Sequence, residues 1–231
     1  MNYQYTYFLI GIGFAVIWLA IFLFRKDTRK EVLIMSIIFG ILGPVSNSLF
    51  IKDWWQPLTI DGTGIGFIES LFVGFVIGGV VGVIYEIIFK KIDGVGVIPS
   101  RKEHLLFFLM APLSLAIFFG GFYLLGLNSF IASCLALFIP AAVILIRRRD
   151  LLPSAFLTGI ITVILAILVY NFVNLLTPNW VEKFWYFRNV PHLIILNLPI
   201  DDVVHYFLLG LFGGPLYEYW KGTNLVRLVN E

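Results

Sequence analysis

The sequence consists largely of long apolar stretches, about seven of them, separated by short polar segments. They lie at residues 3–24, 32–51, 67–89, 105–125, 130–146, 153–176 and 199–220. Each has close to the ~20 apolar residues that an α-helix needs to cross the ~30 Å hydrocarbon core of a bilayer. Because hydrocarbon offers no hydrogen-bond partners to an open backbone, the spans are expected to be helices. The sequence therefore predicts an all-α polytopic membrane protein with about seven transmembrane helices.

Composition excludes the main soluble alternatives. Of the 231 residues, 60% are hydrophobic and 13% are charged, and the mean hydropathy is +0.95. A soluble domain carries about twice that share of charged residues. The net charge of +2 comes from basic residues in short groups between apolar stretches, which does not favour binding to nucleic acid. The single cysteine, Cys134, excludes an internal disulfide and a cysteine-based metal site.

The basic residues predict how the chain is oriented. No positive residue precedes the first apolar stretch, which is typical of a retained helix rather than a signal peptide. Most of the 16 lysines and arginines follow the first, third, fifth and seventh stretches, at Arg25, Lys26, Arg29, Lys30, Lys90, Lys91, Arg101, Lys102, Arg147, Arg148, Arg149, Lys221 and Arg227. Positive charge marks the cytoplasmic side of a membrane protein. We therefore expect a multi-pass protein of the cell membrane, with its amino terminus outside and its carboxyl terminus in the cytoplasm.

Two apolar stretches repeat one pattern. Residues 67–89 align with 199–220 so that these pairs match: Ile68 with Ile200, Glu69 with Asp201, Phe75 with Phe207, Gly78 with Gly210, Gly82 with Gly214, and Tyr85-Glu86 with Tyr217-Glu218. Parallel repeats of this kind can build a site between two halves of a membrane protein. We therefore expect a first three-helix half at residues 1–91, a linker helix at 92–129, and a second three-helix half at 130–231.

Glycines recur along both of these stretches. They are Gly74, Gly78, Gly79 and Gly82 in the first, and Gly210, Gly213 and Gly214 in the second. Small residues four apart let helix backbones approach closely in a membrane. They predict either the seam between the two halves or room for a slim apolar ligand.

A first set of acids lies at the predicted outer ends of these stretches. Charged groups at membrane depth cost ~2.5–3.5 kcal/mol at a helix centre, so such residues are functional candidates. The set comprises Glu69, Asp201 and Asp202, with His205 one turn after Asp201 on the same helix face. Paired carboxylates in a poorly solvated pocket can act as a general acid and a general base. The alternative is helix capping, since Pro199 and the macrodipole both favour acids at a helix start.

A second set lies at the inner ends. Glu86 and Glu218 each follow a tyrosine, Tyr85 and Tyr217. They lie roughly 25 Å from the outer set along a helix, so the two sets cannot share a site. The alternative for this set is pairing with surface arginines or lysines, which contributes little.

His205 and the outer loops also offer alternatives. A lone buried histidine is usually a hydrogen-bonded core residue, whereas beside two aspartates it can orient a carboxylate or relay a proton. No dense histidine spacing indicates a metal, and we expect none. The loops at 52–66 and 177–198 both bring aromatics to the membrane surface, among them Trp54, Trp55 and Trp185. These predict either an aromatic belt or a pair of lids over the acids.

One short motif resembles a known family. Trp185-Tyr186-Phe187 is followed by Leu198-Pro199-Ile200-Asp201-Asp202, with Tyr217-Glu218 at the far end of the same stretch. This resembles the lycopene cyclase domain family, in the fused form of the heterodimeric carotenoid cyclases. The family usually has paired glutamates after the proline, where this chain has Asp201-Asp202. The first half keeps one acid, Glu69, and lacks the proline.

The resemblance implies a membrane-embedded, carotenoid cyclase-like enzyme, an intramolecular lyase or isomerase without a cofactor. Its substrate would be a lipophilic carotenoid or another isoprenoid. Asp201, Asp202 and Glu69 would act as acid and base beside His205. The aromatics at the substrate would be Trp54, Trp55, Trp185, Tyr206 and Phe207. The residues alone leave two alternatives: a proton-coupled transporter or small-molecule-binding membrane protein, and a structural protein whose acids only cap helices.

Overall fold

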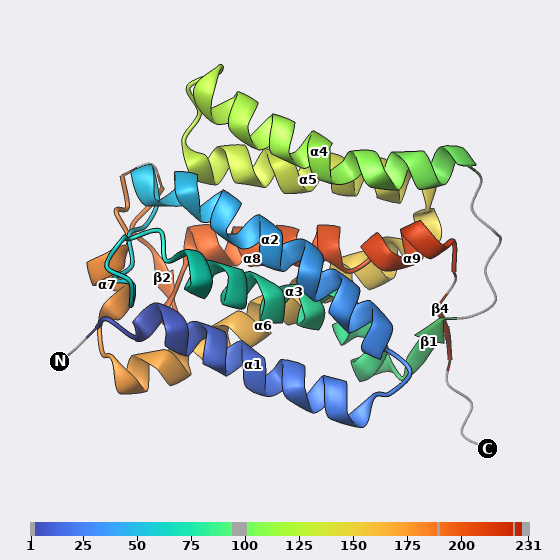
Figure 1. Ribbon diagram of the computed structural model, residues 1–231, viewed down its shortest axis with the longest axis horizontal. Helices are drawn as coiled ribbons and strands as arrows, with labels where there is room; N and C mark the ends of the chain where they lie inside the picture. Colours follow the sequence, from blue (N-terminus) through green and yellow to red (C-terminus); the bar gives the residue numbers. More distant parts are fainter. Residues whose placement is uncertain (1–2, 94–100, 189, 224, 228–231) are drawn as a thin grey trace.

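The structure is a computed structural model that describes residues 3–93, 101–188, 190–223 and 225–227 (Figure 1). It is almost entirely helical, and the predicted all-α fold class is confirmed. The long helices are α1 Thr6–Phe24, α2 Arg29–Asp53, α3 Phe67–Phe89, α4 Arg101–Tyr123, α5 Ser129–Arg147, α6 Leu152–Leu176 and α8 Ile200–Gly213. The short helices are the 3-10 turn η1 Arg149–Leu151, α7 Trp180–Phe184 and α9 Leu216–Lys221.

Strands are short and lie at the two ends of the bundle. At one end, β1 Lys91–Asp93 pairs antiparallel with β4 Leu225–Arg227. At the other, β2 Ile194–Ile195 pairs with β3 Leu198–Pro199 in a hairpin that leads directly into α8. The helices therefore carry the fold, and the strands only join their ends.

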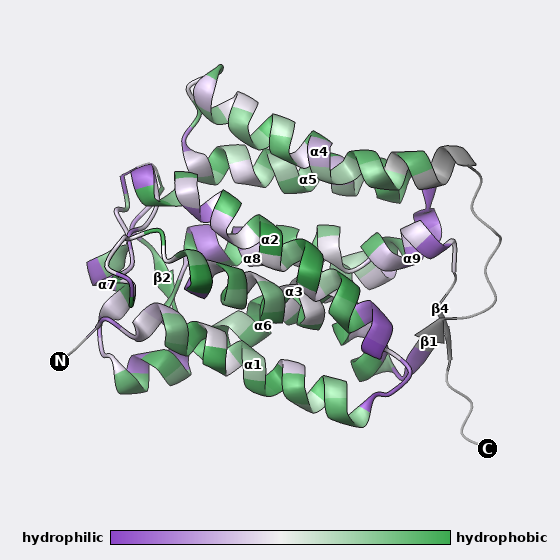
Figure 2. Cartoon of the chain, viewed as in Figure 1, coloured by the Kyte–Doolittle hydropathy of each residue, from purple (hydrophilic) through white to green (hydrophobic). Residues whose placement is uncertain are grey.

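Within the described residues, five helical segments are long and apolar enough to cross a membrane. They are α1, α2, α3, α5 and the continuous run Arg149–Leu176. In α4 a shorter apolar helical stretch is described, Phe107–Tyr123. Figure 2 shows hydrophobic residues along the helices and hydrophilic ones gathered at their ends. This distribution is that of a multi-pass membrane protein.

The last predicted span differs from expectation in one respect. Residues 199–220 form two helices, α8 and α9, rather than one continuous helix. The break falls at Gly214-Pro215, where proline has no N–H to donate to the preceding turn. The predicted extent of this span was therefore right and its continuity was wrong.

Glycines allow the closest helix contacts. A Cβ added at Gly74 in α3 would lie 2.4 Å from the carbonyl oxygen of Phe39 in α2. A Cβ added at Gly210 in α8 would lie 2.6 Å from the Cα of Gly159 in α6. Two helix pairs are therefore packed through glycine, α2 with α3 and α6 with α8. The predicted seam between the halves is wrong for most of these glycines, although Gly213 does contact Val81 of α3.

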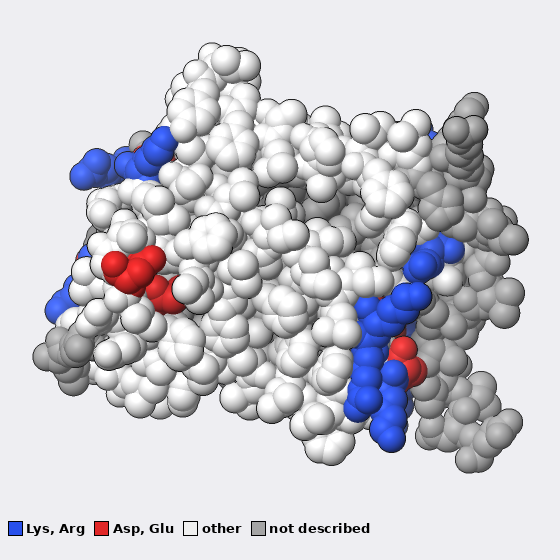
Figure 3. All heavy atoms as spheres, in the orientation of Figure 1, with Lys and Arg blue, Asp and Glu red and all other residues white. Residues whose placement is uncertain are grey.

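The bundle has two chemically different ends. We call the end with the 52–66 and 177–198 loops the aromatic end, and the end with the α1–α2 and α5–α6 connections the basic end. In Figure 3 lysine and arginine side chains lie at both ends, with the larger group at the basic end, and a broad uncharged surface separates the two ends. The site described below lies beneath the aromatic end.

Candidate functional site

The two loops of the aromatic end pair with each other. Trp55 and Trp185 form an antiparallel β-bridge. The Gln56 amide donates to the Phe184 carbonyl at 2.8 Å, and the Tyr186 amide donates to the Trp54 carbonyl at 3.0 Å. These hydrogen bonds join segments that are far apart in the sequence into one cover.

The tryptophans of this cover point inward. Trp54 and Trp185 are each only 6% exposed, and Trp180 of α7 is fully buried. A belt residue would instead present its ring to lipid headgroups. The arrangement is therefore that of lids, the second of the two alternatives offered by the sequence.

A cavity of about 200 Å³ lies beneath the cover. Trp54, Trp55 and Trp185 line its upper part, and most of the remaining lining is apolar. Its walls come from α1, α2, α3, α4, α5, α6 and α8. The polar side chains on these walls belong to Tyr7, Ser46, Asn47, Ser70, Ser114, Ser133, Tyr170, Asp202, His205 and Tyr206. The cavity thus combines an apolar interior with few polar groups, as small-molecule sites do.

Asp202 is the acid that lines the cavity. It lies in the first turn of α8, where Pro199 ends the β3 strand in an extended conformation. Its side chain is 5% exposed, and Tyr170 of α6 donates a hydrogen bond to its Oδ2 at 2.6 Å. Tyr170 also lines the cavity. The pair places a hydrogen-bonded carboxyl group against an apolar space.

Asp201 points elsewhere, because successive residues of a helix face different directions. The indole Nε1 of Trp54 donates to Oδ2 of Asp201, which is 1% exposed and does not line the cavity. Asp201 therefore holds a residue of the cover in place. Helix capping, the alternative for these acids, does not by itself account for this contact between α8 and the 52–66 loop.

His205 lies on the cavity wall about one turn further along α8 than Asp202. Its ring packs edge-on against Trp54, with centroids 5.0 Å apart, and its Nδ1 lies 3.4 Å from the Ser133 hydroxyl. Tyr206, the next residue, also lines the cavity and packs edge-on against Tyr170 at 6.0 Å. His205 thus shares the cavity with Asp202, and its hydrogen-bond contact is to a serine.

Glu69 and Phe207 lie apart from this group. Glu69 is 4% exposed, and its Oε2 accepts a hydrogen bond at 2.9 Å from the amide of Ile60 in the preceding loop. Phe207 packs edge-on against Phe156, with centroids 5.4 Å apart, and contacts Gly159 on α6. Neither side chain lines the cavity. The structure therefore brings Asp202 and His205 together at the cavity, whereas Glu69, in the first turn of α3, binds the loop that precedes this helix.

Sequence reasoning missed the neutral polar groups of the cavity. Ser70, next to Glu69, accepts hydrogen bonds from the Tyr7 hydroxyl at 3.0 Å and from Asn47 Nδ2 at 3.1 Å. With Tyr170, these residues are polar side chains inside apolar stretches. The rule that singled out the acids, applied to tyrosine and asparagine, would have found them.

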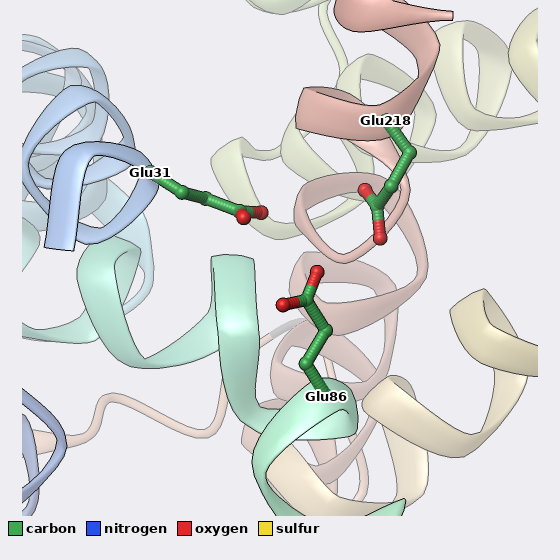
Figure 4. Close-up of side chains that lie close together, drawn as sticks. All are labelled: Glu31, Glu86 and Glu218. Atoms are coloured by element: carbon green, nitrogen blue, oxygen red, sulfur yellow. The ribbon is translucent and has the colours of Figure 1, made fainter. Parts of the chain in front are cut away.

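The acids of the basic end also meet. Glu86 of α3 and Glu218 of α9 are joined by Glu31 of α2, with one oxygen of each within 4.8 Å of the others. Figure 4 shows the three side chains pointing toward one another. All three are buried, at 4% exposure or less, so the alternative of pairing at the surface does not hold for Glu86 and Glu218. Their spacing would suit a metal ion, but each of these acids also has an interaction within the protein, and we assign no metal.

Two arginines near this cluster form ion pairs with aspartates. Arg148 forms an ion pair with Asp150 at 2.7 Å. Arg25 forms one with Asp27 at 2.7 Å, and its hydrogen bond lowers the pKa of that carboxyl from its ordinary value. Arg25 also donates to the backbone carbonyl of Glu86 at 3.4 Å.

The two tyrosines of the predicted inner set differ in exposure, since Tyr217 is buried and Tyr85 is only partly buried.

Comparison with known proteins agrees with the motif. Residues 128–220 match the family model described as lycopene cyclase. The predicted resemblance to the lycopene cyclase family is confirmed. The matched region runs from the start of α5 into α9 and includes Tyr170, Asp202 and His205. No curated protein and no solved structure matches the chain.

Proposed function

We propose that this protein is a membrane-embedded cyclase that closes a ring at the end of a carotenoid or related isoprenoid chain, without net redox change. One observation carries the proposal. Asp202, hydrogen-bonded by Tyr170, lies against an apolar cavity within the region that matches lycopene cyclase. The family match gives the class of chemistry, and the cavity gives a place for it.

The proposed reaction begins with proton transfer. Protonated Asp202 donates its proton to a terminal carbon–carbon double bond, which leaves a carbocation on the chain and a carboxylate on the protein. A second double bond attacks the cation, so that a carbon–carbon bond forms and the charge moves into the new ring. Loss of a proton from the neighbouring carbon then forms the ring double bond. One proton is gained and one is lost, so the product is an isomer of the substrate.

The cavity supplies the other requirements. His205 lies on the same wall as Asp202 and can accept the proton that the ring loses, since a neutral imidazole is a base. Trp54, Trp55 and Trp185 present aromatic groups that attract a cation in a dry space. The paired loops above them exclude water, which would otherwise capture the carbocation. In this scheme Tyr170 and Asp201 are positioning residues, and no redox cofactor is required.

The size of the cavity fits one end of such a chain. Its volume of about 200 Å³ is smaller than the roughly 300–1,000 Å³ typical of sites that enclose a whole drug-sized ligand. A ring-sized end group therefore has room, whereas the rest of a long polyene does not. The reaction concerns only the chain end, so this limit is consistent with the proposal.

The membrane arrangement is part of the same proposal. We place the basic end in the cytoplasm, because positive charge marks that side. The two halves at residues 1–91 and 130–231 are proposed as parallel repeats. Their support is the matched packing of α3 on α2 and of α8 on α6, with glycines at corresponding positions.

The test uses bacterial cells engineered to accumulate lycopene. Pigments are extracted from cells with and without the protein and are resolved by chromatography and absorption spectra. Conversion of lycopene to cyclic carotenes would support the proposal. Unchanged lycopene, with the protein shown to be in the membrane, would contradict it for this substrate.

A second candidate function is proton-coupled transport, or binding of a small molecule, across the same bundle. The observation that favours it is the buried cluster of Glu31, Glu86 and Glu218 at the end opposite the cavity. It predicts ligand-driven proton uptake into vesicles that contain the purified protein, and no product. Cyclic product without proton uptake would exclude it.

A further inference from the structure

We propose that the cavity opens sideways into the bilayer, between α2 and the α4–α5 hairpin, and that the unreacted part of the substrate chain lies in this opening. We call it the side opening, formed by Leu42 and Ser46 of α2 and by Ser114 and Leu115 of α4. The identity of the chain rests on the proposed function. The existence of the opening rests on the geometry alone.

The aromatic end of the cavity and two of its side walls are closed. The aromatic end is covered by the hydrogen-bonded loops that meet at Trp55 and Trp185. The wall between α2 and α3 is closed by backbone contact, since a Cβ at Gly43 would lie 2.2 Å from the Ser70 carbonyl oxygen. The wall between α6 and α8 is closed in the same way at Gly159 and Gly210. A long chain cannot enter through these contacts without separating the helices.

Among the described residues, no backbone contact of this kind closes the wall between α2 and α4. Helix α4 packs chiefly on α5, and Gly121 of α4 faces Ala132 of α5 rather than α2. Toward the aromatic end α2 and α4 meet through Phe50 and Phe118, whose rings pack edge-on at 5.6 Å. Toward the basic end, Phe39 of α2 and Met110 of α4 belong to one buried cluster. The side opening lies between the Phe50–Phe118 contact and this cluster.

Residues at the side opening are partly exposed although they line the cavity. This applies to Leu42, Ser46 and Leu115, whereas Ser114 is buried. Lining residues elsewhere, such as His205 and Leu209, are also partly exposed, so the helix packing described above selects the place of the opening. Figure 3 shows the uncharged face of the molecule hollowed between α4 and α2.

The chemistry of the side opening suits a hydrocarbon chain. Its four residues are apolar or carry a small hydroxyl group, and none is charged. Ser46 satisfies its hydroxyl within α2, by donating to the Leu42 carbonyl at 2.9 Å. A polar solute would lose hydrogen bonds to water here and form few in their place, whereas a polyene has no hydrogen bonds to lose when it leaves the lipid.

Proline residues distinguish the helices around the side opening. Pro44 lies inside α2, Pro112 inside α4 and Pro140 inside α5. An interior proline removes one helix hydrogen bond and favours a bend. Among the long helices that the structure describes, α1, α3 and α8 have no interior proline, and α6 has its proline only in the first turn. The helices that border the side opening are thus the ones with interior prolines.

The test is photolabelling of the purified full-length protein in lipid vesicles, with a linear hydrocarbon that carries a terminal diazirine. After irradiation, adducts are mapped by peptide mass spectrometry. We expect adducts on cavity residues such as Ala136 and Leu209, in addition to lipid-facing residues such as Leu168. Leu115→Trp should reduce the cavity adducts severalfold by filling the passage. The control Leu109→Trp, on the lipid-exposed side of the same helix, should leave them unchanged.

A second pair of variants guards against misfolding. Leu42→Trp should act like Leu115→Trp, and Ile41→Trp, at the adjacent lipid-exposed position, should have no effect. Unchanged adducts on Leu168 show that a variant is still folded in the membrane. Absence of cavity adducts in the native protein, or cavity adducts that persist in both passage variants, would overturn the side opening.

The labelling requires no turnover, so it separates the two proposals. Cavity adducts without cyclic product would support the side opening and contradict the proposed reaction. Cyclic product without cavity adducts would support the proposed reaction and contradict the side opening.

Discussion

Helices α3 and α8 correspond in sequence and differ at the first position of each that lines the cavity. When Glu69 is aligned with Asp201, Ser70 falls opposite Asp202. Both of these residues line the cavity, and each accepts a hydrogen bond from a tyrosine hydroxyl, Ser70 from Tyr7 and Asp202 from Tyr170. The halves thus present similar geometry with different chemistry, a neutral hydroxyl on one side and a carboxyl on the other.

At the opposite end the two repeated segments carry the same acid. Glu86 of α3 and Glu218 of α9 occupy matching positions and enter the same buried cluster with Glu31. The two segments therefore agree at this end and differ at the cavity. In the proposed reaction the second half carries the proton donor, and both halves supply wall and cover.

The largest expected effect is that of Asp202→Asn. The amide keeps the size of the side chain but has no acidic proton to donate, so the rate of ring formation should fall ~1000-fold or more. Rates are measured on membranes supplied with lycopene, at equal amounts of folded protein. Asp201→Asn is the matched control and should lose far less, because an amide oxygen still accepts from Trp54. Equal losses in both variants would contradict the assignment of Asp202.

The next largest effect is on stability. Gly210→Val forces a side chain against the backbone of Gly159, 2.6 Å from the added Cβ, and should destabilise the fold by about 2–3 kcal/mol. Gly120→Val is the control, since a Cβ there meets only Leu124 at 3.9 Å. The measurement is the thermal midpoint in detergent. Equal midpoints for the two variants would show that α6 and α8 are not packed through glycine.

Paired tyrosine variants sharpen the comparison of the two halves. Tyr170→Phe removes the hydrogen bond to Asp202 and should slow ring formation ~10-fold, a loss of about 1.4 kcal/mol. Tyr7→Phe removes the matching hydrogen bond to Ser70 and should change the rate less than threefold, roughly. The KM for lycopene is measured in parallel, since lost positioning lowers kcat more than it raises KM. The reverse ranking of the two variants would place the proton donor in the first half.

The smallest effect is expected for Glu69→Gln. Its oxygen can still accept from the Ile60 amide, and the side chain does not line the cavity, so the rate should stay within about twofold. This variant tests directly whether Glu69 takes part in the reaction. Loss of turnover with the fold intact would return Glu69 to the catalytic set that the sequence predicted.

Much of the fold could be predicted from the sequence, because a bilayer requires long apolar helices and hydropathy reveals them directly. The interruption at Gly214-Pro215 was also open to prediction, from proline's missing N–H. The glycine contacts were misassigned because spacing shows that helices approach, but not which helices. Gly78, for example, faces Met35 and Phe39 of its own half.

The site could be predicted only in part. The sequence pattern assigned Asp201 and Asp202 to one site. The side chains of adjacent helical residues point in different directions, however. Their partners, Trp54 for Asp201 and Tyr170 for Asp202, show which of the two faces the cavity. Glu31 was missed because it lies in the first turn after a loop and looks like a solvated charge. Its burial depends on α3 and α9, which no local pattern reveals.

The most direct test of the central claim is cyclisation carried out in heavy water. Membranes containing the protein are equilibrated in D2O and supplied with lycopene, and the product is analysed by mass spectrometry. If protonated Asp202 begins the reaction, each new ring gains one deuterium and loses one hydrogen, so the product is heavier by one mass unit per ring. A cyclic product without deuterium, or one whose hydrogen count differs from that of the substrate, would contradict the account.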